Sequence, residues 1–102
     1  MASLEGEKCF LDTDMSLSKL SRIVGTNTNY LSKTINQAFG CTFSDLMNHY
    51  RVEHVKAQLQ KGDKSIEELV GNSGFRSRSS FFEVFRRETG VTPYKYARMY
   101  KQ

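Results

Sequence analysis

The chain has 102 residues, 38% of them hydrophobic and 25% charged, which suits one ordinary globular domain and excludes a large multidomain machine. No run approaches the roughly 18 consecutive apolar residues of a membrane helix, and the first ten residues lack the features of a secretory signal, so we expect a cytoplasmic protein. Charge is uneven, because residues 1–73 carry eight Lys or Arg against nine Asp or Glu, whereas residues 74–102 carry seven against two. This asymmetry predicts a polyanionic partner, either nucleic acid or an anionic membrane surface.

Two helices are predicted between residues 15 and 40. Apolar residues recur three and four positions apart and no hairpin turn signal is present, so the fold should be all-α. The first helix begins after Ser16 and ends at Gly25, with an apolar stripe made by Leu17, Leu20, Ile23 and Val24. The second is capped by Thr26 or Asn27 and ends at Gly40, with an inner stripe made by Leu31, Ile35 and Phe39.

A long helix is predicted over about residues 43–61. Thr42 and Asp45 have the spacing of a capping box, and Gly62 offers a C-terminal stop. The apolar side of this helix consists of Phe43, Met47, Val52, Val55 and Leu59. At 1.5 Å per residue, its roughly 19 residues span about 28 Å.

The pattern then begins again over about residues 65–90. Ser65 and Glu68 have capping-box spacing, and the apolar residues that follow are Ile66, Leu69 and Val70. After a cap at Ser77, the next helix carries Phe81, Val84 and Phe85 and ends at Gly90. Thr92 and Pro93 open a last helix over about residues 93–101, with Tyr94, Tyr96, Ala97 and Tyr100.

The two halves of the chain repeat one another. Leu17, Leu20 and Gly25 recur 49 residues later as Ile66, Leu69 and Gly74, and Leu31, Ile35 and Gly40 recur 50 residues later as Phe81, Phe85 and Gly90. A short helix, a tight turn with glycine and a longer helix make the layout of a helix-turn-helix, although a helical hairpin duplicated for packing has the same spacing. A linker of about 28 Å would hold two recognition helices near the ~34 Å repeat of the major groove.

Both copies resemble the AraC/XylS family of transcription regulators. The first copy is SLSKLSRIVGTNTNYLSKTINQAFG, and the second, GFRSRSSFFEVFRRETGVTPYKYARMY, carries that family's signature at Gly74, Phe75, Ser77, Ser79, Phe81, Phe85, Arg86, Arg87, Gly90, Thr92, Pro93 and Tyr96. The resemblance covers about residues 11–100 and implies two helix-turn-helix units joined by a linker helix, about seven helices in all, within a DNA-binding domain over residues 15–102. The helix that the family places ahead of the first unit is expected to be abbreviated or missing in residues 1–14, a short and partly disordered lead.

The resemblance places the base contacts on both recognition helices. In the first, the groove-reading positions fall on Asn29, Ser32 and Lys33; Asn pairs with adenine, and Lys reaches guanine or a phosphate. In the second, the side opposite the core carries Arg78, Ser79, Phe82 and Glu83. Arg78 could fork onto guanine and Phe82 could touch a thymine methyl group. Glu83 could accept from cytosine or pair with Arg86 or Arg87.

Phosphate contacts are expected beside these positions. The candidates are Arg76, Arg86 and Arg87, with backbone N–H groups at the helix starts near Ser77 and Thr28. Such contacts set affinity rather than sequence choice. The sequence therefore predicts a domain that binds double-stranded promoter DNA, with RNA polymerase and a sensor or dimerisation domain of a longer native chain as the further partners that the resemblance allows.

Two other function classes compete with DNA binding. A helical protein-interaction module would dock its basic face on an acidic partner and use Tyr94, Tyr96 and Tyr100. An enzyme is not expected, because the sequence offers no phosphate loop and no nucleophile with a histidine partner. Nor do we expect a cofactor or metal, since His49 and His54 lie on separate sides of a helix and Cys9 and Cys41 form no CxxC pair.

Overall fold

The computed structural model describes residues 9–100, and no strand occurs among them, so the predicted all-α class is confirmed. The elements in chain order are the 3-10 turn η1 (Cys9–Leu11) and the helices α2 (Leu17–Val24), α3 (Thr28–Phe39), α4 (Phe43–Lys61), α5 (Ile66–Asn72), α6 (Arg78–Thr89) and α7 (Pro93–Met99). Within this range, six α-helices and one 3-10 turn stand against the expectation of about seven helices. Residues 1–8 of the predicted lead lie outside the described residues.

The helix ends follow the capping signals in the sequence. Every α-helix begins after a side chain that accepts a hydrogen bond from the backbone N–H three residues further on, and these caps are Ser16, Asn27, Thr42, Ser65, Ser77 and Thr92. The capping box of Ser65 and Glu68 forms in both directions. Of the two caps proposed for α3, Asn27 is the one used. Local chemistry therefore sets the helix boundaries, and tertiary packing sets how the helices are arranged.

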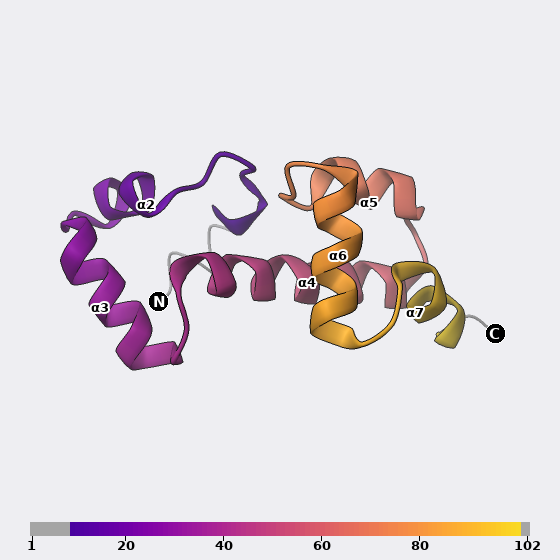
Figure 1. Ribbon diagram of the computed structural model, residues 1–102. Helices are drawn as coiled ribbons and strands as arrows, with labels where there is room; N and C mark the ends of the chain where they lie inside the picture. The colour runs from indigo at the N-terminus through magenta and orange to yellow at the C-terminus, as the bar shows by residue number, and fades with distance from the viewer. Residues whose placement is uncertain (1–8, 101–102) are drawn as a thin grey trace.

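Helix α4 forms the long axis of the molecule, whose extents are 46 × 23 × 22 Å. α2 and α3 lie at one end of it, and α5, α6 and α7 lie at the other (Figure 1). The helix buries two different sides along its length, because Leu46 and Met47 pack into a first core while Val52, Val55 and Leu59 pack into a second. One helix therefore carries both units.

The second core is rich in aromatic side chains. Phe81 and Phe85 on α6 are fully buried, which confirms their prediction as core residues. They meet Phe75 and Tyr96 edge to face, with ring centroids 5.6 Å apart for Phe75 and Phe81 and 5.5 Å apart for Phe85 and Tyr96. Helix α7 thus closes the second core through Tyr96.

The first core is smaller, and part of its predicted stripe is wrong. Leu20, Leu31 and Ile35 are buried with Phe10 from the lead. Ile23, Val24 and Phe39, however, are 48%, 39% and 39% exposed. Ile23 and Val24 stand in the last turn of α2, and Phe39 is the last residue of α3. Periodicity predicts which side of a helix is apolar, but not how far along the helix the partner reaches.

Candidate nucleic-acid interface

Helix α6 is positioned by its aromatic core and presents a polar side. The Ser77 side chain caps the helix by accepting a hydrogen bond from the backbone N–H of Ser80 at 3.1 Å. With Phe81 and Phe85 held inward, the exposed side chains of the predicted site on and beside this helix are Arg76, Ser77, Arg78, Ser79, Glu83, Arg86 and Arg87. Phe82 is only half-buried and packs at the margin of the second core. The helix therefore offers a cationic surface built on a rigid base.

Arg78 is held by side chains from three helices. Its Nη1 donates to both carboxylate oxygens of Glu67 on α5, at 2.5 Å each. Its Nη2 donates to the Tyr94 hydroxyl on α7 at 3.4 Å. The guanidinium carbon lies 4.8 Å from the centre of the Phe82 ring. The Tyr94 ring stacks on the Phe82 ring, with the two ring centroids 5.7 Å apart. Arg78 is thus ordered before any ligand arrives.

The ion pair shapes the chemistry of Arg78. The hydrogen bond from Arg78 lowers the pKa of the Glu67 carboxyl, and the same bond, aided by Tyr94, raises the pKa of Arg78. Both groups are therefore charged at neutral pH. Glu67 takes Nη1 and Tyr94 takes one N–H of Nη2, so the Nε N–H and the second N–H of Nη2 are the pair that can bind a base such as guanine.

Two predicted base contacts and two predicted phosphate contacts share one depression. Phe82, Glu83, Arg86 and Arg87 line a shallow hollow of about 550 Å³ together with Thr92. Within the described residues, Glu83 forms no ion pair with Arg86 or Arg87, although the helical spacing would allow it. Both arginine side chains are exposed and make no ion pair within residues 9–100.

Arg76 and Ser77 have partners within the protein. The Nε of Arg76 donates to the Thr13 carbonyl at 3.2 Å, and its Nη2 lies 3.9 Å from Oδ1 of Asp14. Ser77 is the cap of α6. Arg76 is nevertheless 75% exposed, so its guanidinium remains open to an anion from solvent.

Helix α3 presents fewer charges than α6. Thr28, Asn29 and Lys33 are exposed, and the helix has no acidic residue in its first turn. Ser32 is half-buried and lines a hollow with Leu17 of α2 and Phe43 of α4, so it stands at the edge of the exposed side. The structure thus brings Thr28, Asn29 and Lys33 to one helix start and leaves Ser32 beside them.

The sequence matches the family described as "Helix-turn-helix domain" over residues 20–99. The chain belongs to the helix-turn-helix domain family. An uncharacterized HTH-type transcriptional regulator of Staphylococcus aureus strain MSSA476 is 37% identical over 83 residues, which cover 81% of this chain and 11% of that protein. The melibiose operon regulatory protein of Escherichia coli K12 is 29% identical over 91 residues, covering 89% of this chain and 30% of that protein. The helix-turn-helix domain thus spans only a small part of these relatives.

Solved structures agree with this assignment. The C-terminal domain of AraT, a response regulator from Geobacillus stearothermophilus, has a TM-score of 0.82 at 27% identity, over 90% of this chain and 76% of that one. The C-terminal domain of the two-component response regulator yesN from Fusobacterium nucleatum has a TM-score of 0.79 at 27% identity, over 89% of this chain and 88% of that one. The AraC/XylS resemblance is confirmed, and the chain is a helix-turn-helix domain of the kind that these regulators carry.

Sequence reasoning missed two residues of the helix-turn-helix surface. Glu67 was not among the predicted site residues, and Tyr94 was considered only for packing or for protein docking. The pairing of either with Arg78 joins residues 11 and 16 positions apart, which no local pattern reveals. An exposed carboxylate in the helix before a recognition helix that begins with arginine is the signal that could have found Glu67.

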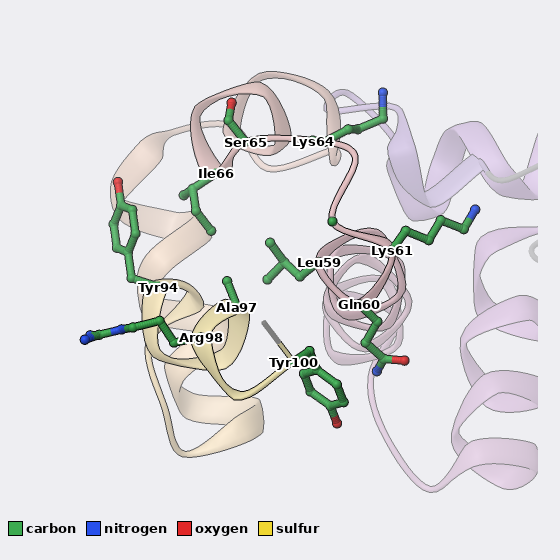
Figure 2. Close-up of a pocket in the computed structure, with 11 residues that line it drawn as sticks. Leu59, Gln60, Lys61, Lys64, Ser65, Ile66, Tyr94, Ala97, Arg98 and Tyr100 are labelled. Atoms are coloured by element: carbon green, nitrogen blue, oxygen red, sulfur yellow. The ribbon is translucent and has the colours of Figure 1, made fainter. Parts of the chain in front are cut away.

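A separate pocket of about 740 Å³ lies at the far end of the helix-turn-helix domain, between α4, α5 and α7. Figure 2 shows Leu59, Ile66 and Ala97 pointing into it, while the charged ends of Lys61 and Arg98 extend away. None of the predicted DNA contacts lines this pocket. Among residues 9–100 there is also no cluster of three or more potential metal ligands, and no helix is long and apolar enough to span a membrane.

Proposed function

We propose that this domain recognises a specific sequence of double-stranded promoter DNA by placing α3 and α6 in two successive segments of the major groove. The observation that carries the proposal is the repeated unit on a single axis, in which α3, beyond one end of α4, and α6, which crosses α4, run in the same general direction (Figure 1). The 19 residues of α4 span about 28 Å, close to the ~34 Å repeat of the groove. One chain can then contact two successive segments of the major groove, which usually requires a dimer.

The side chains divide into two roles. Arg78, Ser79, Phe82 and Glu83 from α6, with Asn29, Ser32 and Lys33 from α3, read base edges. Arg76, Arg86 and Arg87 hold phosphates, and the N-terminal backbone N–H groups at Thr28 and Ser77 do the same. The ordered Arg78 supports the first role, and the open charges of Arg86 and Arg87 support the second.

We infer that the native protein is longer than this domain. In that protein the domain is the output part of a cytoplasmic regulator that also carries a sensor or dimerisation domain and contacts RNA polymerase. The domain acts by binding and not by catalysis. The longer relatives, of which the domain spans 11% and 30%, support this view.

Selection from a pool of random duplexes, followed by fluorescence titration of the enriched and of scrambled DNA at several salt concentrations, tests the proposal. We expect an enriched motif with two blocks about one helical turn apart and a much weaker, more salt-sensitive affinity for scrambled DNA. Equal binding to every duplex, lost at moderate salt, would count against sequence-specific recognition.

A further inference from the structure

The lead segment, residues 10–14, lies between the two helix-turn-helix units and contacts α4 at its middle. Arg51 of α4 donates from Nε to the Phe10 carbonyl at 2.6 Å and from Nη2 to the Asp12 carbonyl at 3.2 Å. Nε and Nη2 form one edge of the guanidinium, so the two bonds together clamp the backbone of the lead. The Arg51 guanidinium also lies 5.9 Å from the centre of the Phe75 ring, which belongs to the second core.

The same lead is fixed to the first unit. The Phe10 ring is buried among the residues of the first core. The Asp12 carboxylate forms an ion pair with Lys19 on α2, and this bond lowers the pKa of Asp12. The lead therefore moves with the first unit.

The lead also touches the turn of the second unit. Gly74 has a φ of +89°, and a Cβ placed there would lie 2.3 Å from the Phe10 carbonyl oxygen and 2.8 Å from Nε of Arg51. Only glycine permits this approach of two backbones. Arg76, two residues later, donates to the Thr13 carbonyl. The second unit is thus joined to the first through the lead, beside the Arg51 side chain and off the axis of α4.

We propose that Arg51 is a positioning residue that, with the lead, fixes the orientation of the second unit relative to the first and thereby the spacing of the two DNA segments that the domain reads. This inference rests on the proposed function. A single helix can curve along its length, so α4 alone would let the units swing. A second attachment at a distance from its axis resists that bending.

Arginine is suited to this position because its planar fork donates to two carbonyls while its face covers an aromatic ring. A lysine has one compact ammonium group and cannot reproduce the paired bonds. The change Arg51→Lys therefore keeps the charge and loses the clamp. Arg98→Lys, at an exposed arginine on α7, is the matched control.

The first measurement is the distance between spin labels at Gln37 on α3 and Glu88 on α6, both exposed, with Cys9 and Cys41 replaced by Ser. We expect one narrow distance distribution in the otherwise unchanged chain and in Arg98→Lys, and a broader one in Arg51→Lys. An unchanged width in Arg51→Lys overturns the proposal. If Arg51→Lys does not fold, Asp12→Asn replaces it, because this change frees the lead from Lys19 and leaves α4 intact.

The second measurement is the affinity of the complete chain for its selected duplex and for the same duplex with one base pair inserted between the two blocks. We expect Arg51→Lys to lower the ratio of these affinities several-fold, whereas Arg98→Lys leaves it unchanged. A ratio that Arg51→Lys does not alter overturns the link to spacing. If the unaltered chain binds no duplex, both the proposed function and the link between Arg51 and DNA spacing fail. The width of the spin-label distance distribution still decides whether Arg51 fixes the orientation of the two units.

Discussion

The first helix-turn-helix unit closes its core with Leu31 and Ile35, whereas the second has Phe81 and Phe85 at the matching positions. The second unit is also covered by α7 through Tyr96, whereas within residues 9–100 no such helix covers the ends of α2 and α3, where Ile23 and Phe39 are exposed. One sequence repeat thus yields two cores of different size. The comparison shows that two copies of one helix-turn-helix unit can differ in the size and packing of their cores.

The recognition helices differ in the same way. α6 carries Arg78 fixed by Glu67 and Tyr94, while α3 carries the uncharged Asn29 and a single cation, Lys33. Most of the positive charge lies in the second unit, and so does the arginine that other side chains hold in place. We therefore expect the second unit to supply most of the affinity and the first to add selectivity.

The largest effect should come from removing an aromatic side chain of the second core. Phe85 is fully buried, so Phe85→Ala should lower the free energy of unfolding by about 3–5 kcal/mol. Urea denaturation followed by circular dichroism measures it. Ile35→Ala, the counterpart in the first unit, should cost about 2–5 kcal/mol and leave the amide protons of α6 more protected from exchange than those of α3. Equal loss of protection in both helices would contradict two cores of unequal firmness.

Base reading by the second unit should be separable from phosphate binding. We expect Arg78→Ala to reduce discrimination at one base pair roughly ten- to a hundredfold, because the guanidinium can pair bidentately with guanine. Arg87→Ala should weaken binding to all sequences alike and reduce the slope of affinity against salt. Titration of single-base variants of the selected duplex measures both changes. A uniform loss from each substitution would show that Arg78 does not read a base.

Helix caps should have smaller effects that fall on one unit at a time. Asn27→Ala removes the cap of α3, and Ser65→Ala removes the capping box of α5. Each should cost about 0.5–2 kcal/mol of stability, measured by thermal unfolding. Asn27→Ala should also weaken DNA binding, since it loosens the start of a recognition helix. If Ser65→Ala weakened binding more than Asn27→Ala did, the assignment of α3 as a reading helix would be wrong.

The smallest effect should be the acid dependence of the Arg78 pair. Arg78 lowers the pKa of Glu67 below the ordinary value of about 4.3, so the pair stabilises the fold above that value and is lost as the pH falls through the lowered pKa. Its contribution is small because both side chains are exposed. Nuclear magnetic resonance of the Arg78 guanidinium should show a step below pH 4.3 that is missing in Glu67→Gln. A step at higher pH would place Glu67 outside the pair.

Most of the fold was predictable from local patterns. The caps at Ser16, Ser65 and Thr92 depend on neighbours one turn away, and the inward positions of Phe81 and Phe85 follow from the helical period, and the structure confirms both. The exposed ends of α2 and α3 were not predictable, because exposure there depends on where a partner helix stops. The predicted polar positions of α3 and α6 lie at the surface, with Ser32 and Phe82 half-buried, and their role as DNA contacts stays a prediction. The partners of Arg78 and Arg51 were not, since both pairings join elements that are distant in sequence.

Helix α4 has a consequence for how such domains can change. Its two buried sides are locked in phase, with Met47 serving one core and Val52 the other. Inserting a single residue between them would turn everything downstream by about 100° while lengthening the helix by only 1.5 Å. An insertion in α4 would therefore destroy the mutual alignment of α3 and α6, whereas substitutions on their exposed sides would leave it intact.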